Sequence, residues 1–460
     1  MTVKDAQDGG PRKGTHGQAP AAAPVVILGG GLTGISTAAH LDAPWVLFER
    51  DDRLGGHART DERDGYKFDK TGHWLHLRDA GVKRLVEEIL PGEMVPIARR
   101  ARIFSHGALT RFPFQANLHG LPPEVVKECL LGVIEAKVKA AAGTERDDPK
   151  NFEEYCLRHF GAGISKHFMI PYNEKLWGVS PREITAAWCS RFVPLPNVEQ
   201  IVAGAVGAGP PEMGYNVSFL YPRSGGIEVF ARALATRMRT QHGKVNLGTS
   251  PDTIDWQRRE VIAGGARVPY RALVATIPLP ELLKRMPNLP PDIEAHAGRL
   301  RCTTLRYVNI ASRAQPPADW HWIYVPERKY PFYRVNVFSS AMPTMAPAGG
   351  ASICVEMSDR GPVGDEALRD SILALTAAGA LSSPDDVVFA ERKEIQYAYV
   401  VFDDNYYAAT HAIFSFLEAN GIYPRGRYGA WTYNAMEDCV LAGREVAGLI
   451  DGLPSAKAAS

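Results

Sequence analysis

Three glycines near the N-terminus have the spacing that lets a backbone approach a phosphate group. Gly29, Gly31 and Gly34 follow the apolar run 25–28 and open a helix-like run of small and apolar residues. The glycines allow a tight turn, and the unpaired N–H groups and dipole of the helix favour a pyrophosphate. Glu49 ends a second apolar run twenty residues after Gly29, where a carboxylate can accept hydrogen bonds from a ribose diol. These residues predict a dinucleotide site; the alternative interpretation is an ordinary βα turn.

Further segments extend this site and favour FAD over NAD. Gly55, Gly56 and Arg59 closely follow Glu49, the acid that we expect to bind the ribose. The two glycines permit a second close approach of the backbone to the cofactor. The segment 245–278 resembles the second half of a glutathione-reductase-type FAD domain, as found in the amine-oxidase superfamily. Residues 433–443 resemble its closing glycine-rich turn, where a helix N-terminus stabilises negative charge on a reduced flavin. The predicted cofactor-binding residues are Gly29, Gly31, Gly34, Glu49, Gly55, Gly56, Arg59, Arg427 and Asp438.

Composition excludes several classes of protein. The 460 residues are 45% hydrophobic and 22% charged, as in a globular chain of two or three domains. A net charge of +1 gives no reason to expect nucleic acid or an anionic membrane. No apolar run approaches the roughly 18–20 residues of a membrane span. Six scattered cysteines without C-x-x-C indicate reduced thiols in the cytoplasm and no zinc site. We also expect no other metal.

The order of the expected elements predicts an α/β protein. Its Rossmann-type FAD-binding domain, of the glutathione-reductase kind, is interrupted by a helical insert and by an antiparallel β-sheet insert. The predicted boundaries are a disordered leader over 1–23, FAD-binding parts over 24–100, 201–290 and 401–453, a helical substrate domain over 101–200, a sheet substrate domain over 291–400 and a tail over 454–460.

Further segments resemble the UDP-galactopyranose mutase family, especially its eukaryotic-type members. Thr71-Gly72-His73-Trp74 is similar to a G-G-H loop, and residues 112–115 are similar to an aromatic-P-F-Q segment. Residues 171–177 resemble P-Y-N-x-K-x-W, with Arg191 downstream, and residues 331–334 read P-F-Y-R. The resembling segments are 71–74, 112–115, 171–191, 216–222 and 322–334.

The resemblance implies a role for each matching residue. His73 would lie beside the isoalloxazine, and Arg191 and Arg334 would hold the diphosphate, so these three are the implied catalytic residues. Two guanidinium groups suit a group with about two negative charges, because each gives planar bidentate donors. Each arginine could instead form a structural ion pair or a cation–π contact. The implied substrate-binding residues are Phe114, Gln115, Tyr172, Trp177, Asn216, Trp322, Tyr324, Tyr406 and Tyr433.

The resemblance also implies a reaction. Reduced FAD would attack the anomeric carbon of a nucleotide-diphosphate sugar through N5, and the nucleoside diphosphate would leave. The flavin–sugar adduct would open to an iminium and reclose through a different hydroxyl, which interconverts pyranose and furanose forms, and the diphosphate would then return to the anomeric carbon and release the flavin. No net redox change results. The implied partners are a UDP-linked sugar, an electron donor such as NAD(P)H, and further copies of the chain in a homo-oligomer.

One residue departs from the family pattern, and more than one function remains open. Ala341 lies where eukaryotic-type members have a tyrosine, so the sugar and the nucleoside are not fixed by the resemblance. The second hypothesis is an oxidase or desaturase of the amine-oxidase superfamily, similar to protoporphyrinogen oxidase. A flavoprotein without catalysis and an NAD-linked dehydrogenase also stay open.

Overall fold

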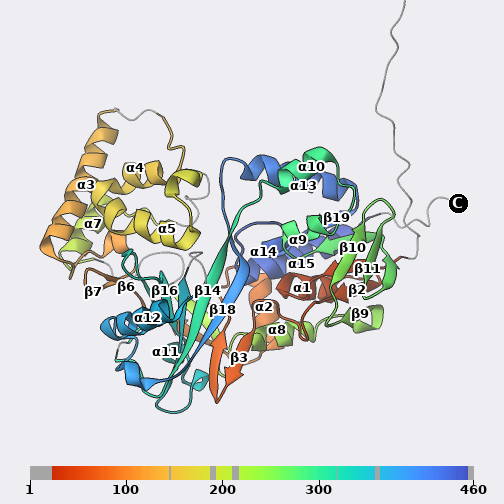
Figure 1. The fold of residues 1–460 in the computed structure, drawn as a ribbon, viewed down its shortest axis with the longest axis horizontal. Helices are drawn as coiled ribbons and strands as arrows, with labels where there is room; N and C mark the ends of the chain where they lie inside the picture. The colour runs from red at the N-terminus through yellow and green to blue at the C-terminus, as the bar shows by residue number, and fades with distance from the viewer. Residues whose placement is uncertain are drawn as a thin grey trace, which may run out of the picture.

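The structure is a computed structural model that describes residues 23–143, 147–186, 193–209, 217–317, 319–357 and 363–453. Residues 1–22 and 454–460, which include most of the predicted leader and the predicted tail, lie outside the described residues. Figure 1 shows a helical region at the left, long strands in the centre and an α/β region at the right. In the described ranges, no helix is both long and apolar enough to cross a membrane.

A five-stranded parallel sheet forms the centre of the α/β region (Figure 1). Every residue of its central strand is apolar and buried, as expected for a strand covered on both faces. Helix α1 (Leu32–His40) packs against both α8 (Glu228–Ala235) and α15 (Met436–Asp451). The sheet therefore combines distant parts of the chain. Its strand order is β19 (Ile422–Pro424), β13 (Ala272–Ala275), β1 (Val25–Leu28), β2 (Trp45–Phe48) and β9 (Gly243–Asn246).

A seven-stranded sheet occupies the centre of the molecule, where β14 and β18 are its longest strands (Figure 1). Its neighbouring strands are antiparallel, except that β15 and β6 run parallel. The order is β18 (Val387–Val400), β14 (Cys302–Ser312), β17 (Ala351–Met357), β16 (Arg334–Val337), β15 (Trp322–Tyr324), β6 (Ala101–Ser105) and β7 (Ala108–Arg111).

Strands β6 and β7 correct the predicted boundary of the helical insert. Residues 101–111 belong to the sheet, although we predicted them to be part of the helical region. His106 and Gly107 form the two-residue loop of this hairpin, with φ of 52° and 75°. Two successive positive φ angles match the twist of a tight hairpin. The loop lacks the Asn-Gly or Asp-Gly pair that would have predicted the turn.

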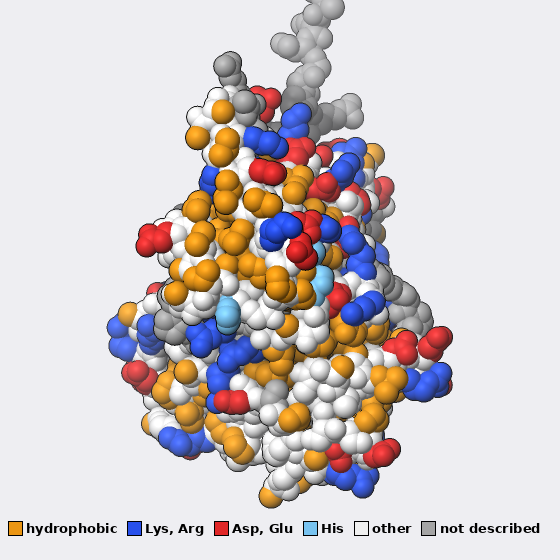
Figure 2. Space-filling view, turned by 90° about the vertical axis from the view of Figure 1, so that its left-hand side faces the viewer, with side chains coloured by type: hydrophobic (Ala, Val, Ile, Leu, Met, Phe, Trp, Pro, Cys, Tyr) orange, Lys and Arg blue, Asp and Glu red, His pale blue; other side chains and the backbone are white. Residues whose placement is uncertain are grey.

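The helical region consists of α3 (Pro123–Ala141), α4 (Phe152–Ile164), α5 (Ile170–Trp177) and α7 (Val198–Ala205). A π-helical segment, Ser165–Met169, joins α4 to α5. Figure 2 looks onto this side of the molecule, where hydrophobic side chains gather at the surface. The exposed apolar side chains of these helices include Leu131, Ile134 and Val138 of α3 and Val202 of α7, and Val206 directly after α7 is exposed as well.

Shorter elements connect these regions. The other described strands are β3 (Thr60–Arg63), β4 (Tyr66–Asp69), β5 (Met94–Ala98), β8 (Ser218–Pro222), β10 (Pro251–Asp255), β11 (Glu260–Ala263) and β12 (Ala266–Pro269). The other described α-helices are α2 (Ala80–Ile89), α9 (Leu279–Lys284), α10 (Pro291–Ala297), α11 (Phe338–Ala341), α12 (Asp365–Ala377), α13 (Tyr406–Ala419) and α14 (Gly426–Gly429).

Candidate active site

The glycine-rich turn between β1 and α1 is shaped by close approach of the backbone. Gly29 has a φ of 100°, and a Cβ on Gly34 would lie 2.0 Å from the carbonyl oxygen of Gly29. Both positions therefore require glycine. A Cβ on Gly31, in contrast, would meet only the Cα of Gly56, at 3.8 Å, among the described atoms within 4 Å. The N-terminus of α1 thus keeps an open position of the kind that a pyrophosphate group needs.

Glu49 lies beside this turn, directly after β2. Its side chain is buried, and Oε2 accepts a hydrogen bond from the Gly30 N–H at 2.6 Å. Oε1 accepts another from the Asp51 N–H at 2.9 Å. These bonds fix the carboxylate next to the glycine turn, where its remaining lone pairs can accept from a diol.

The second glycine pair lies against the first turn. Gly55 and Gly56 have φ of 115° and 60°, and the Gly55 N–H donates to the carbonyl oxygen of Gly30 at 2.8 Å. Arg59 is buried, and its guanidinium donates to an Asp51 carboxylate oxygen at 2.6 Å. In this structure Arg59 therefore holds its own loop, and its contact with FAD stays a prediction.

The loop that contains His73 follows β4 and turns sharply. Thr71 has a φ of 67°, a strained conformation for a β-branched residue. Burial, together with Arg427, lowers the pKa of His73 to about 4, so its imidazole is neutral at physiological pH. Burial and then Lys70 likewise hold the pKa of His57 well below its ordinary value.

These groups fit a flavin dinucleotide. Nδ1 of His57 and Nδ1 of His73 are buried and have no hydrogen-bond partner among the described residues. A buried ring nitrogen without a partner is costly, and a ligand that donates to it or accepts from it removes that cost. The open glycine turn, the fixed Glu49 carboxylate and these two nitrogens together make a site for the hydrogen-bonding groups of FAD.

Arg334 and Glu356 form a bidentate ion pair beside the His73 loop. Arg334 Nε donates to Glu356 Oε1 at 2.9 Å, and Nη2 donates to Oε2 at 2.6 Å. Burial opposes the charged form, yet the Glu356 carboxylate raises the pKa of Arg334 well above its ordinary value. The side chain of Arg334 is 20% exposed, that of Glu356 is 0% exposed, and no bond from Nη1 to a described residue is present. One edge of the guanidinium is thus left for a ligand.

Glu356 joins this pair to the loop. It accepts hydrogen bonds from Asn336 Nδ2 at 2.6 Å, from the Tyr333 hydroxyl at 3.0 Å and from the Gly72 N–H at 3.4 Å. Gly72 precedes His73, so one buried carboxylate positions both Arg334 and the loop that we predict to face the isoalloxazine.

Tyrosines surround Arg334. Tyr172 packs edge-on against Tyr324 and Tyr333, with ring centroids 5.5 and 6.1 Å apart. Arg334 Nη2 donates to the Tyr399 hydroxyl at 3.4 Å. Burial raises the pKa of all four phenols, which therefore stay neutral and can donate hydrogen bonds.

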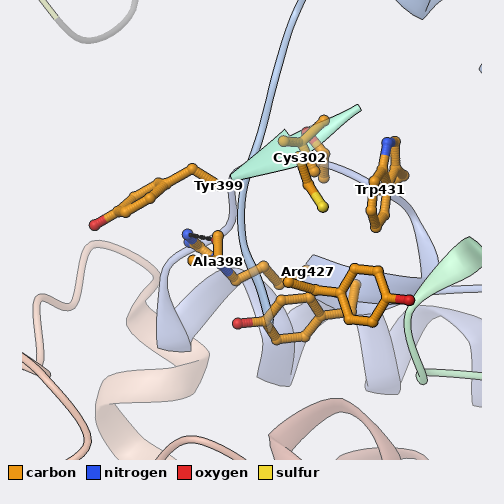
Figure 3. A pocket seen from close by; sticks show the side chains of 9 residues that line it. Cys302, Ala398, Tyr399, Arg427 and Trp431 are labelled. Atoms are coloured by element: carbon orange, nitrogen blue, oxygen red, sulfur yellow. Dashed lines mark hydrogen bonds between the residues drawn. The ribbon is translucent and has the colours of Figure 1, made fainter. Parts of the chain in front are cut away.

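Arg427 organises the other side of this cluster (Figure 3). Its guanidinium donates to the carbonyl oxygens of Ala398, at 3.1 Å, and of Asn434, at 2.9 Å. It lies 4.6 Å from the ring centroid of Tyr433 and 5.4 Å from that of Tyr399, and these two rings stack 6.2 Å apart. Arg427 and Tyr399 also line a narrow pocket together with Cys302 and Trp431. The structure thus brings a second guanidinium and two phenols next to Arg334.

Several predicted base-binding residues are packed against protein groups. Phe114 is fully buried and stacks on Phe168, with centroids 5.0 Å apart. Gln115 is buried and donates through Nε2 to the carbonyl oxygen of Pro194 at 2.8 Å. Trp322 stacks on Trp74 at 5.5 Å. A nucleobase would therefore have to displace or extend these contacts.

Three other predicted residues have structural partners. Trp177 is buried and donates through Nε1 to Asn173 Oδ1 at 3.2 Å. Tyr406 does not join the cluster, because its hydroxyl donates to the Trp431 carbonyl oxygen at 2.8 Å. Asp438 accepts from the Ala435 N–H at 2.8 Å, at the start of α15. Arg191 and Asn216 lie outside the described residues, so their roles stay predictions.

Sequence reasoning missed Glu356 and Tyr399. Glu356 is the single charged residue in strand β17, all of whose residues are buried, and this isolation is a signal for a buried ion pair. Tyr399 lies near the end of β18, seven residues before Tyr406. Because Tyr399 and Tyr406 are close in the chain and of the same type, the sequence does not show which of them faces the cluster.

Comparisons with known proteins show the family and the fold of the chain. Residues 32–450 match the family described as flavin containing amine oxidoreductase, and the chain belongs to this family. The fold resembles the crystal structure of reduced UDP-galactopyranose mutase, with a TM-score of 0.87, 27% identity and 94% of each chain covered. A putative protoporphyrinogen oxidase from Exiguobacterium shares the fold at a TM-score of 0.72 and 18% identity.

Two curated relatives match parts of the chain. The dTDP-fucopyranose mutase of Escherichia coli is 30% identical over 180 residues, which cover 36% of this chain and 45% of that protein. The coproporphyrinogen III oxidase of Mycobacterium leprae is 25% identical over 297 residues, covering 60% of this chain and 64% of that protein. The chain thus aligns with less than two thirds of each relative.

These matches confirm the predicted fold class and the predicted resemblance, and they identify FAD as the cofactor.

Proposed function

We propose that the protein is a flavin-dependent mutase that interconverts pyranose and furanose forms of a nucleotide-diphosphate sugar, with UDP-galactose as its substrate. The ion pair of Arg334 with Glu356 carries this proposal, because it presents a guanidinium edge beside the His73 loop. The similarity to UDP-galactopyranose mutase over 94% of the chain supports it.

Side chains of this protein can bind the nucleoside diphosphate while it is detached from the sugar. Reduced FAD would supply a nucleophilic nitrogen, N5, for the anomeric carbon and would regain its starting redox state. Arg334 Nη1 would bind a diphosphate oxygen, while Glu356 keeps the guanidinium oriented. The hydroxyls of Tyr399 and Tyr433 would donate further hydrogen bonds. The predicted second arginine, Arg191, would complete this set.

An oxidase is the second candidate, favoured by the match to the mycobacterial coproporphyrinogen III oxidase. Such an enzyme has no use for guanidinium groups next to phenols around a diphosphate. The half-buried Arg334, held by Glu356 and next to the Tyr399 hydroxyl, therefore supports the mutase proposal over the oxidase.

Turnover under reducing conditions distinguishes the candidates. Protein reduced anaerobically with dithionite is incubated with UDP-galactose and with dTDP-fucose, and the products are separated by chromatography. We expect the furanose form of the UDP-sugar, and Arg334→Ala should retain FAD but lose this activity. Conversion of the dTDP-sugar alone would refute UDP-galactose as the substrate. Oxygen uptake with oxidation of a porphyrinogen would refute the proposed mutase activity.

We further propose the remaining partners of this enzyme. NAD(P)H would supply the electrons for flavin reduction. Two copies would associate through the apolar surface of α3 and α7, where Leu131 is 49% exposed and Val202 is 41% exposed. We place the enzyme in the cytoplasm, because its six cysteines are scattered along the sequence and form no C-x-x-C pair.

A further inference from the structure

Lys70 is a half-buried cation without a partner in the described part of the chain. It follows β4 and precedes the strained Thr71. Its ammonium forms no hydrogen bond with a described residue and has no described carboxylate within 4.0 Å. Burial and then Arg59 lower its pKa. Removing an ammonium group from water without pairing it with an anion costs free energy. A negatively charged ligand at this position would remove that cost.

The acids near Lys70 are already used by arginines. Asp51 and Asp61 are the carboxylates that raise the pKa of Lys70, while Arg59 and Arg53 lower it. Asp51 is paired with Arg59 at 2.6 Å, and Asp61 is paired with Arg53 at 2.9 Å. Lys70 therefore adds an uncompensated positive charge to this group.

The backbone places Lys70 next to the cofactor turn. The Lys70 N–H donates to the carbonyl oxygen of Arg59 at 3.1 Å, and Arg59 Nε donates to the Leu54 carbonyl oxygen at 3.2 Å. Leu54 precedes Gly55, which bridges to Gly31 at the start of α1. His57 lies close enough to Lys70 that the charge of Lys70 is, after burial, the largest cause of the lowered pKa of His57.

The conformation of the loop is fixed on both sides of Lys70. Asp69 is fully buried and accepts hydrogen bonds from the Tyr221 hydroxyl at 2.5 Å and from the Thr60 hydroxyl at 2.7 Å. Thr71 holds its positive φ, and the Gly72 N–H donates to Glu356. Backbone strain of this kind persists where the surroundings over-determine it, and it occurs often at ligand clamps.

We propose that Lys70 binds the diphosphate of FAD, as a direct cofactor ligand that complements the N-terminus of α1. The helix terminus supplies only about half of a positive charge, whereas the diphosphate carries about two negative charges. A lysine on the facing loop supplies a full charge. This inference rests on FAD as the cofactor and does not depend on the proposed mutase activity.

The test compares holoprotein variants by FAD release and by phosphorus NMR. Lys70→Met removes the charge but keeps an unbranched apolar stem, and Lys70→Arg keeps the charge. Lys67→Met is the matched control, because Lys67 lies on the same hairpin and is 3.8 Å from Glu62. Release is followed by the rise in flavin fluorescence after dilution, at low and at high salt.

We expect Lys70→Met to release FAD about 10- to 100-fold faster at low salt, as for the loss of one charge-assisted hydrogen bond. High salt should reduce the difference in release rate between Lys70→Met and wild type. One phosphorus resonance of bound FAD should shift in Lys70→Met. Lys70→Arg should restore most of the retention, and Lys67→Met should match wild type.

Three results would overturn the proposal. The first is release from Lys70→Met within threefold of wild type. The second is faster release with both phosphorus resonances unmoved, which would place Lys70 against another part of the cofactor or in a purely structural role. The third concerns the case in which Lys70→Met contains no FAD after expression. If Lys70→Arg then also contains no FAD, a positive charge at this position is not what FAD binding requires.

Discussion

The ion pair of Arg334 with Glu356 makes a quantitative prediction about stability. Glu356→Gln keeps the shape of the side chain but removes its charge and one of the two oxygens that accept hydrogen bonds from the guanidinium. Removing one partner of a buried pair costs about 3–5 kcal/mol. Because the side chain of Arg334 is 20% exposed, we expect the lower end, about 3 kcal/mol.

The reverse substitution should cost less. In Arg334→Met the carboxylate keeps the hydrogen bonds from Asn336, Tyr333 and Gly72, so its charge remains partly compensated. We expect about 1–2 kcal/mol for this variant. The double variant removes both charges. Its loss in free energy of unfolding should be smaller than the sum of the losses in the two single variants by about 2–3 kcal/mol.

Urea denaturation of the FAD-loaded variants measures these differences, with circular dichroism reporting unfolding and flavin fluorescence reporting cofactor release. Each midpoint is compared with that of wild type at the same FAD concentration, because bound cofactor adds to the apparent stability. Additive effects within about 0.5 kcal/mol would show that the two residues do not act as a pair. A larger cost for Arg334→Met than for Glu356→Gln would refute the role of Glu356 as the shared acceptor.

Three further perturbations follow from the geometry. Gly31→Ala should fold but bind FAD weakly, whereas Gly34→Ala should fail to fold. A Cβ on Gly34 would lie 2.0 Å from a backbone carbonyl oxygen, whereas a Cβ on Gly31 would make an ordinary contact at 3.8 Å; thermal melts and flavin absorbance check both variants. Tyr399→Phe should weaken UDP binding about tenfold in calorimetry, and Tyr406→Phe should leave it unchanged; equal effects would contradict the placement of these phenols. Burial raises the pKa of Asp69 to about 7 from 3.8, so the folded protein retains a proton that the unfolded chain releases. Stability should therefore fall by up to about 4 kcal/mol as pH rises from about 4 to 7, and Asp69→Asn should flatten this slope in urea titrations.

The cofactor half of the site was predictable because its signals are local. A glycine turn, a following helix and an acid at the end of the next strand occupy about twenty-five consecutive residues, and each position has a separate physical reason. The fold class was predictable for the same reason, since buried parallel strands are apolar throughout. Residues 101–111 were assigned wrongly because the chain forms a tight hairpin there without the usual turn residues.

The substrate half was less predictable because its contacts join distant residues. Arg334 was identified by its motif, but its partner Glu356 lies on the next strand, and the pairing register that aligns them exists only in the folded sheet. The same holds for Tyr399 and Tyr433, which Arg427 brings together from two separate elements. Phe114 and Trp322 are buried by neighbours that no sequence pattern reveals.

The interleaved parallel sheet has a consequence for how this protein is made in the cell. Its central strand β1 is translated long before its neighbour β13 and the edge strand β19, and α15 is translated later still. The nascent chain must therefore carry an exposed apolar strand until β13 has been made, which promotes aggregation and favours chaperone binding. The sheet that supports the flavin site is complete only once β19 has been made, so we expect flavin capture to follow the translation of that strand.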